Sequence, residues 1–106
     1  MKYDLRLSRK AAQDRDLDYA WFERNYSTRF ADRWYVGLSR AVNAIRSSPL
    51  SSPLSSDINE EGLEIREYLD DYSGKHKYRI LYSIAEKQIH VLRIWHSAKG
   101  TPEWGE

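Results

Sequence analysis

The chain has 106 residues, a length that supports one domain rather than two. Its 17 Lys and Arg against 16 Asp and Glu leave a net charge of +1, which excludes a strongly basic protein and confines any nucleic-acid binding to a local patch. The absence of cysteine excludes a disulfide scaffold, a thiolate metal site and a cysteine nucleophile, and a content of 41% hydrophobic and 13% aromatic residues excludes intrinsic disorder.

The N-terminus, Met1 to Arg6, alternates charged with apolar side chains and does not resemble a signal peptide. No apolar run approaches the roughly 20 residues that a membrane helix needs. We therefore expect a soluble cytoplasmic protein that has no membrane association. We also expect no cofactor and no small-molecule ligand.

The first half of the chain predicts a short strand followed by two helices. Tyr3, Leu5 and Leu7 alternate with polar residues, which indicates a half-buried strand. Ser8 is a candidate N-cap for a helix over 9–25. The apolar stripe expected to bury this helix consists of Ala12, Leu17, Ala20 and Trp21.

Ser27 is a second candidate N-cap, and the apolar spacing predicts a helix over 28–46. The stripe of this second helix consists of Phe30, Trp34, Leu38, Ala41 and Ile45. The break between the two helices is short, so they should form an antiparallel hairpin in which Trp21 and Trp34 belong to the core.

A tandem Ser-Ser-Pro-Leu repeat over 47–56 predicts a surface loop, because Pro49 and Pro53 bar a helix. Three strand-like stretches follow, around 63–69, 77–84 and 89–96, with a tight turn at 85–88. The last stretch is apolar on both faces and should be internal in the sheet. Residues 97–106 predict an irregular tail.

The predicted fold class is therefore α+β: a strand, a two-helix antiparallel hairpin and a three-stranded antiparallel meander, arranged in two layers as one domain over 1–106. The charge is uneven along this order. Residues 1–46 carry a net charge of +4, residues 57–71 carry −6, and residues 75–99 carry +5 together with all three histidines. The basic patch, if it binds a partner, lies in this last stretch.

The element order and several local sequences resemble the RelE/ParE superfamily of toxins from type II toxin–antitoxin systems. The matching sequences are Tyr-Asp-Leu-Arg-Leu-Ser at 3–8, Leu-Glu-Ile-Arg-Glu at 63–67, Tyr-Arg-Ile-Leu-Tyr-Ser-Ile at 78–84 and Val-Leu-Arg-Ile-Trp-His at 91–96. The resemblance covers nearly the whole chain and implies a growth-inhibiting toxin that a cognate antitoxin protein neutralises by lying over the sheet and helices.

The resemblance implies one of two targets. RelE-like members are endoribonucleases that cut mRNA on the ribosome without a metal, and ParE-like members inhibit DNA gyrase by protein binding. A basic cluster that includes Lys77, Arg79 and His96 favours the ribosome-dependent nuclease. The small residues Ser97 and Ala98 after His96 are also typical of ParE-like sequences, which leaves the gyrase inhibitor as the alternative. A member that only binds antitoxin and DNA is a third possibility.

The resemblance assigns roles to individual residues. Arg79 occupies the family's arginine position and would grip a phosphate, His96 would act as acid or base, and Lys77 would assist as a third catalytic residue. The predicted nucleic-acid-binding residues are Lys75, Lys77, Arg93 and Lys99.

Structural roles compete with these assignments. Arg79 could pair with Glu64 or Glu67 across the sheet, Arg93 could stack on Trp95, and His96 could cap its strand. The three histidines show no spacing typical of a metal site, so we expect none.

Overall fold

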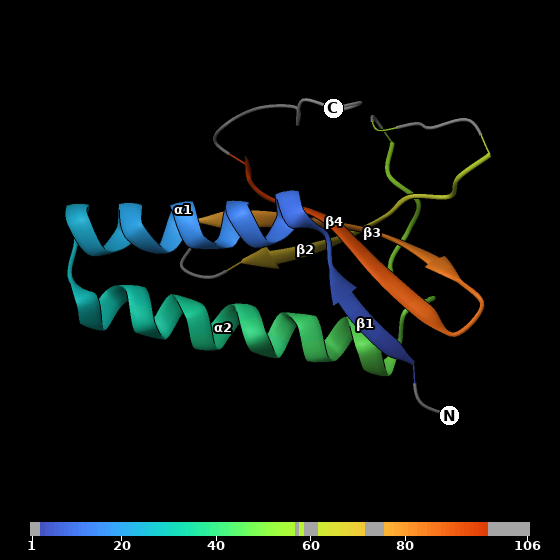
Figure 1. Cartoon of the computed structure of the whole chain (residues 1–106), viewed down its shortest axis with the longest axis horizontal. Helices are drawn as coiled ribbons and strands as arrows, with labels where there is room; N and C mark the ends of the chain where they lie inside the picture. Colours follow the sequence, from blue (N-terminus) through green and yellow to red (C-terminus); the bar gives the residue numbers. More distant parts are fainter. Residues whose placement is uncertain (1–2, 57, 59–61, 72–75, 98–106) are drawn as a thin grey trace.

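A computed structural model describes residues 3–56, 58, 62–71 and 76–97. The elements in chain order are β1 (Asp4–Leu7), α1 (Arg9–Asn25), α2 (Thr28–Ser47), β2 (Arg66–Asp71), β3 (Lys77–Ala85) and β4 (Gln88–His96) (Figure 1). This order confirms the predicted fold class. No helix in the described part of the chain is long and apolar enough to cross a membrane.

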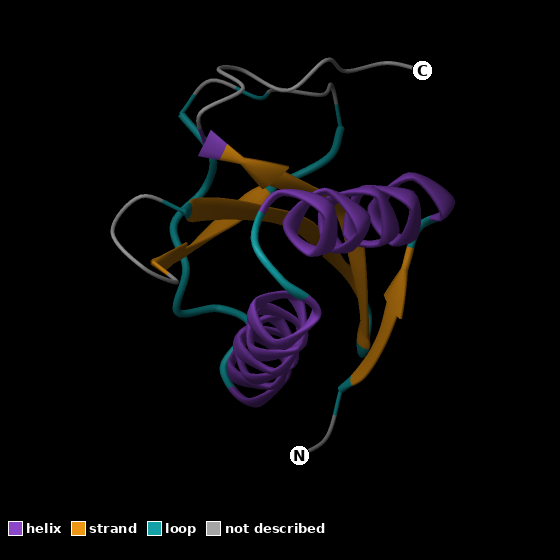
Figure 2. Ribbon diagram, turned by 90° about the vertical axis from the view of Figure 1, so that its left-hand side faces the viewer, coloured by secondary structure: helices purple, strands orange, loops and turns teal. Residues whose placement is uncertain are grey.

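The four strands form one mixed sheet in the order β1-β4-β3-β2. β1 pairs with β4 in parallel, and the other two pairings are antiparallel. β4 is therefore internal, as its apolar faces predicted. The helices lie together on one side of the sheet (Figure 2), and buried side chains from both helices share one core cluster with β3 and β4.

Both predicted N-caps are confirmed. The Ser8 hydroxyl accepts a hydrogen bond from the Ala11 N–H at 3.0 Å, and the Ser27 hydroxyl accepts one from the Phe30 N–H at 3.0 Å. Ser8 also donates to the Leu92 carbonyl at 2.9 Å. The start of α1 is thereby fixed to the internal strand, which sets where α1 crosses the sheet.

α2 buries the side that its sequence predicted. Its buried residues are Ala31, Trp34, Leu38, Ala41 and Ile45. Trp34 is 1% exposed and packs against the Tyr78 ring of β3, with ring centroids 5.5 Å apart. The regular spacing of these residues at three and four keeps one face of the helix on the sheet.

The predicted face of α1 is wrong. Leu17 is 62% exposed and Trp21 43% exposed, and the buried residues are Ala11, Asp14, Asp18 and Phe22. Two of these four buried residues are acidic. A stripe chosen from apolar residues alone therefore points to a different side of α1 from the side that is buried. The buried aspartates are tolerated because both have polar partners on the sheet, as described below.

A β-bulge interrupts β4. Leu81 faces Arg93 and Tyr82 faces Val91, so Leu92 is an extra residue without an opposite partner. The bulge inverts the alternation: Ile89 and Val91 point into the main core before it, and Ile94 does so after it. Unbroken alternation along the strand would place Arg93 on the same face as Ile89 and Val91, and this one extra residue puts it on the opposite face.

The Ser/Pro segment is an ordered surface loop after α2. The Tyr82 hydroxyl donates to the Pro49 carbonyl at 2.6 Å in a buried position, and the Glu67 N–H donates to the Pro53 carbonyl at 2.9 Å. Leu54 forms an isolated antiparallel bridge with Arg66. The loop therefore covers the outer edge of β2 at the start of that strand.

Candidate interaction site on the sheet

The candidate residues lie on the adjacent strands β3 and β4. Lys77 is exposed and Arg79 partly buried on β3, and Arg93 and His96 are partly buried on β4. Lys75 and Lys99 lie outside the described residues. Strand alternation places Lys77 and Arg79 on the face opposite Tyr78, whereas His96 pairs with Tyr78 and contacts its ring at 4.9 Å. The structure thus separates His96 from Arg79 and Lys77 by the thickness of the sheet.

Arg79 is paired with Glu67 of the neighbouring strand β2. Its Nη2 lies 2.8 Å from Glu67 Oε1, and the two side chains are 12% and 16% exposed. The Ser55 hydroxyl of the Ser/Pro loop also donates to Glu67 Oε1, at 3.3 Å. The sequence predicted Glu64 or Glu67 as the partner of Arg79, and this contact involves Glu67. The ion pair is largely shielded from water.

Arg93 is held by Asp14 of α1. Its Nε and Nη2 donate to the two carboxylate oxygens of Asp14 at 2.8 and 2.9 Å, a bidentate pair. The guanidinium also lies 4.8 Å from the Trp95 ring centroid, which confirms the predicted stacking. Asp14 was not among the predicted site residues, because nothing in the local sequence distinguishes it from Asp16 and Asp18 on the same helix.

His96 belongs to a hydrogen-bonded line of three side chains. Its Nε2 lies 3.1 Å from Nδ1 of His76, and Nε2 of His76 lies 3.2 Å from the Tyr26 hydroxyl. His76 is only 7% exposed. Neither His76 nor Tyr26 was among the residues that the sequence singled out as candidates. The available signal was the alternation that puts His76 two residues before the core residue Tyr78.

Tyr78 adds a second buried polar contact from α1. It is hydrogen-bonded to Asp18, and burial, with a further contribution from the Asp18 charge, raises the pKa of the Tyr78 phenol well above its ordinary value of 10.0. Tyr78 therefore remains a neutral donor at any physiological pH. This bond explains why α1 can bury Asp18 against the sheet.

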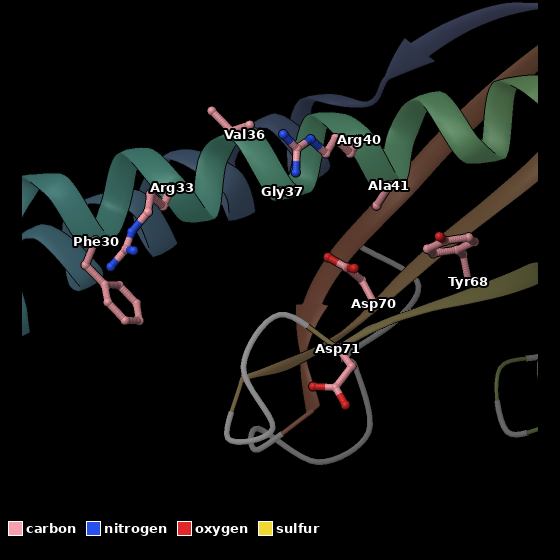
Figure 3. A pocket seen from close by; sticks show the side chains of 9 residues that line it. All are labelled: Phe30, Arg33, Val36, Gly37, Arg40, Ala41, Tyr68, Asp70 and Asp71. Carbon is pink, nitrogen blue, oxygen red and sulfur yellow. The ribbon is translucent and has the colours of Figure 1, made fainter.

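A groove of about 760 Å³ lies between α2 and the edge strand β2 (Figure 3). Arg33 and Arg40 lie on its α2 wall, and Asp70 and Asp71 lie on its β2 wall. Its remaining lining is mostly apolar and consists of Phe30, Val36, Gly37, Ala41 and Tyr68. Burial, together with the neighbouring Asp71 charge, raises the pKa of Asp70 above its usual 3.8.

The backbone edge beside this groove is partly open. The Glu67 N–H points outward to the Ser/Pro loop, so the antiparallel pattern also directs the N–H and C=O of Leu69 outward. Among the described residues none pairs with the edge at Leu69, whose side chain is 69% exposed. This edge can accept an added strand.

Over the described ranges, no three His, Asp or Glu side chains converge as a metal site would require. What the site offers is a set of ion-paired arginines on one face of the sheet, a histidine line on the other, and a charged groove beside an open edge.

Comparison with known proteins identifies the family. Residues 5–100 match the model of the ParE toxin of the type II toxin–antitoxin system parDE, so the chain belongs to the ParE toxin family. A solved structure described as a chromosomal ParDE toxin–antitoxin system from P. aeruginosa has a similar fold, with a TM-score of 0.71 and 19% identity. The match covers 89% of this chain and 95% of that one. Comparison with curated proteins gives no match.

Proposed function

We propose that this ParE-family toxin slows growth by binding DNA gyrase and that it does not cleave RNA. The observation that carries the proposal is the engagement of both candidate arginines: Arg79 is ion-paired with Glu67, and Arg93 with Asp14. The family match to ParE supports the same target.

RNA cleavage by a side-chain site needs cations and an acid or base gathered around one phosphate. Here the Glu67 carboxylate faces the Arg79 guanidinium at 2.8 Å and would repel a phosphate from the same position. His96 lies on the other face of the sheet, beside Tyr78. A protein-binding mode requires none of these groups to meet at one reacting atom.

Ribosome-dependent mRNA cleavage is the second candidate. Exposed Lys77 and the titratable His96 ring favour it, because one could hold a phosphate and the other could transfer a proton. This mode would require Arg79 to leave Glu67 when RNA binds.

The decisive experiment tests the two targets in parallel, with purified protein for DNA gyrase and with induced cells for mRNA. We expect the purified chain to inhibit supercoiling by DNA gyrase in vitro, and its expression to induce the DNA-damage response while mRNA remains intact. Toeprinting on ribosomes after induction tests the other target. Cleaved message together with unimpaired gyrase would refute the proposal.

The cognate antitoxin implied by the family needs a docking surface, and we propose the groove between α2 and β2. An extended antitoxin segment could pair with the backbone of Leu69 and place acidic side chains against Arg33 and Arg40. The Ser/Pro loop already occupies the edge up to Glu67, so the segment would continue along the remaining edge.

This docking surface can be tested with the product of a small gene adjacent to this one. We expect the charge reversal of Arg33 and Arg40 to Glu to weaken binding of that protein at least tenfold in calorimetry. Arg24→Glu, an exposed change on α1 outside the groove, is the matched control. Equal affinity of the double variant and the control would place the antitoxin elsewhere.

A further inference from the structure

β1 is the outermost strand at one margin of the sheet, and β2 forms the opposite margin (Figure 2). The Asp4 N–H donates to the Lys87 carbonyl at 2.9 Å. The Ser8 N–H donates to the Val91 carbonyl, also at 2.9 Å. Successive residues of a strand direct their backbone groups to opposite edges. The N–H and C=O of Leu5 therefore face outward, away from β4.

The outward edge of β1 is open along most of its length. Arg46 Nε of α2 donates to the Tyr3 carbonyl at 3.0 Å, which agrees with the outward direction of the odd-numbered residues. Within the described part of the chain, the outward backbone groups of Leu5 and Leu7 have no hydrogen-bond partner. A groove of about 480 Å³ lies beside this edge, between β1 and the last turns of α2. β1 can therefore accept an added strand.

The side chains of β1 alternate between the core and the solvent. Leu5 packs against the main core, whereas Asp4 and Arg6 are exposed. Their register neighbours on β4 are Gln88 and His90. Neither Asp4 nor Arg6 makes an ion pair with another described residue. The open edge thus presents one acid and one base, two residues apart and on the same face.

A second copy of the chain fits this edge in one register. When two β1 strands pair antiparallel about a two-fold axis at Leu5, the two Leu5 residues exchange N–H···O bonds, and Asp4 of each copy lies opposite Arg6 of the other. An axis at Asp4 or at Arg6 would instead place that residue opposite its own copy. Like charges directly opposite each other destabilise a strand pair. The charges of β1 therefore select the register centred on Leu5.

We propose that two copies of this chain associate through antiparallel β1–β1 pairing centred on Leu5, with reciprocal contacts between Asp4 and Arg6. The two four-stranded sheets then join into one continuous sheet. The groove beside β2 lies at the far margin of each copy, so the dimer leaves both proposed antitoxin surfaces uncovered. Because the ladder is short, the expected dissociation constant is about 100 μM. The dimer does not depend on which target the toxin has.

The first test measures association of the purified full chain by sedimentation velocity, from about 10 μM to about 1 mM. We expect Asp4→Arg and Arg6→Asp each to weaken association about tenfold, because each change sets like charges at both reciprocal contacts. An equimolar mixture of the two variants should regain association, since the arginines of one then face the aspartates of the other. Arg29→Asp, at the opposite end of α2 from the β1 groove, is the matched control.

Circular dichroism confirms that each variant folds. A chain that stays monomeric at about 1 mM overturns the proposal. Variants that associate as well as the control, or a mixture that associates no better than its components, overturn it as well. If the unmodified chain is monomeric and Arg6→Asp weakens binding of the protein from the adjacent gene, the edge belongs to the antitoxin and the dimer is refuted.

The second test examines the register by disulfide crosslinking, since the chain has no cysteine of its own. Directly opposed residues outside the hydrogen-bonded pairs have Cα atoms about 4.5 Å apart, within the range of a disulfide. We expect a mixture of Asp4→Cys and Arg6→Cys chains to crosslink about fivefold faster than either variant alone, because only the mixture sets two thiols opposite each other. Equal rates overturn the register. Neither test uses gyrase, so its outcome is separate from that of the proposed function.

Discussion

The Asp14 carboxylate on α1 binds the Arg93 side chain on β4 through two hydrogen bonds and also accepts the Ile94 N–H at 3.0 Å. β1 pairs with β4 only as far as Val91, so beyond that point the edge of β4 needs another acceptor. Asp14 provides it. One buried carboxylate thus completes the sheet edge, neutralises the arginine and fixes the rotation of α1.

Replacing Asp14 with Ala should destabilise the protein by about 3 kcal/mol or more, because a largely buried arginine and a backbone N–H both lose their acceptor. Urea unfolding measures the loss. Asp16→Ala is the control, since the Arg15–Asp16 pair has a carboxylate side chain that is 69% exposed, and the expected cost there is below about 1 kcal/mol. Similar costs for both variants would contradict this role of Asp14.

Replacing the Arg79–Glu67 pair with Met and Leu should leave growth inhibition intact, because we assign the pair a structural role. Removing one partner alone should cost about 1–3 kcal/mol of folding free energy, since the other charge stays partly buried. Colony survival after induction measures the first effect and chemical denaturation the second. A fully folded double variant that no longer inhibits growth would show that Arg79 acts on the target.

Tyr82→Phe should lower the free energy of unfolding by about 1–2 kcal/mol. The lost hydrogen bond is buried and leaves the Pro49 carbonyl without this donor. The Ser/Pro loop should then exchange its amide hydrogens faster, because the bond anchors the loop to β3. Tyr35→Phe, on an exposed ring, should change stability by less than about 0.5 kcal/mol. Unchanged exchange in the loop would argue against the anchoring role.

Asp70→Asn should stabilise the protein at pH 7. Burial first, and then the Asp71 charge, raise the pKa of Asp70 above 3.8, so the folded state binds this proton more tightly than the unfolded state. Stability associated with Asp70 is therefore present below pH 3.8 and is lost as the pH rises through the higher folded value. The gain in melting temperature should shrink at pH 3. A gain of the same size at both pH values would contradict this assignment.

Much of the fold was predictable because it depends on local physical chemistry. Ser8 and Ser27 cap helices through bonds to amides three residues away, and α2 buries a stripe whose period matches its own turn. Strand alternation located β3 and β4 for the same reason. These features depend on residues that are close together in the chain, so they can be predicted from the local sequence.

The candidate site depended on contacts between distant residues, and the sequence did not determine these. Asp14 and Arg93 are 79 residues apart, and Tyr26 and His76 are 50 apart. The single extra residue at Leu92 reversed the faces of β4 and moved Arg93 away from the core. No local sequence pattern predicts a bulge, and none indicates which aspartates of a helix pair with a buried partner.

The element order, the helix caps and the near-zero net charge, which confines any charged surface to local patches, all follow from the amino-acid sequence. The tertiary contacts pair Arg79 and Arg93 with acids from β2 and α1 and place His96 within hydrogen-bonding distance of His76, and none of these contacts follows from the sequence pattern. The physical reason is that charge balance and proton sharing act through space at about 3 Å, whereas sequence patterns report only positions along the chain.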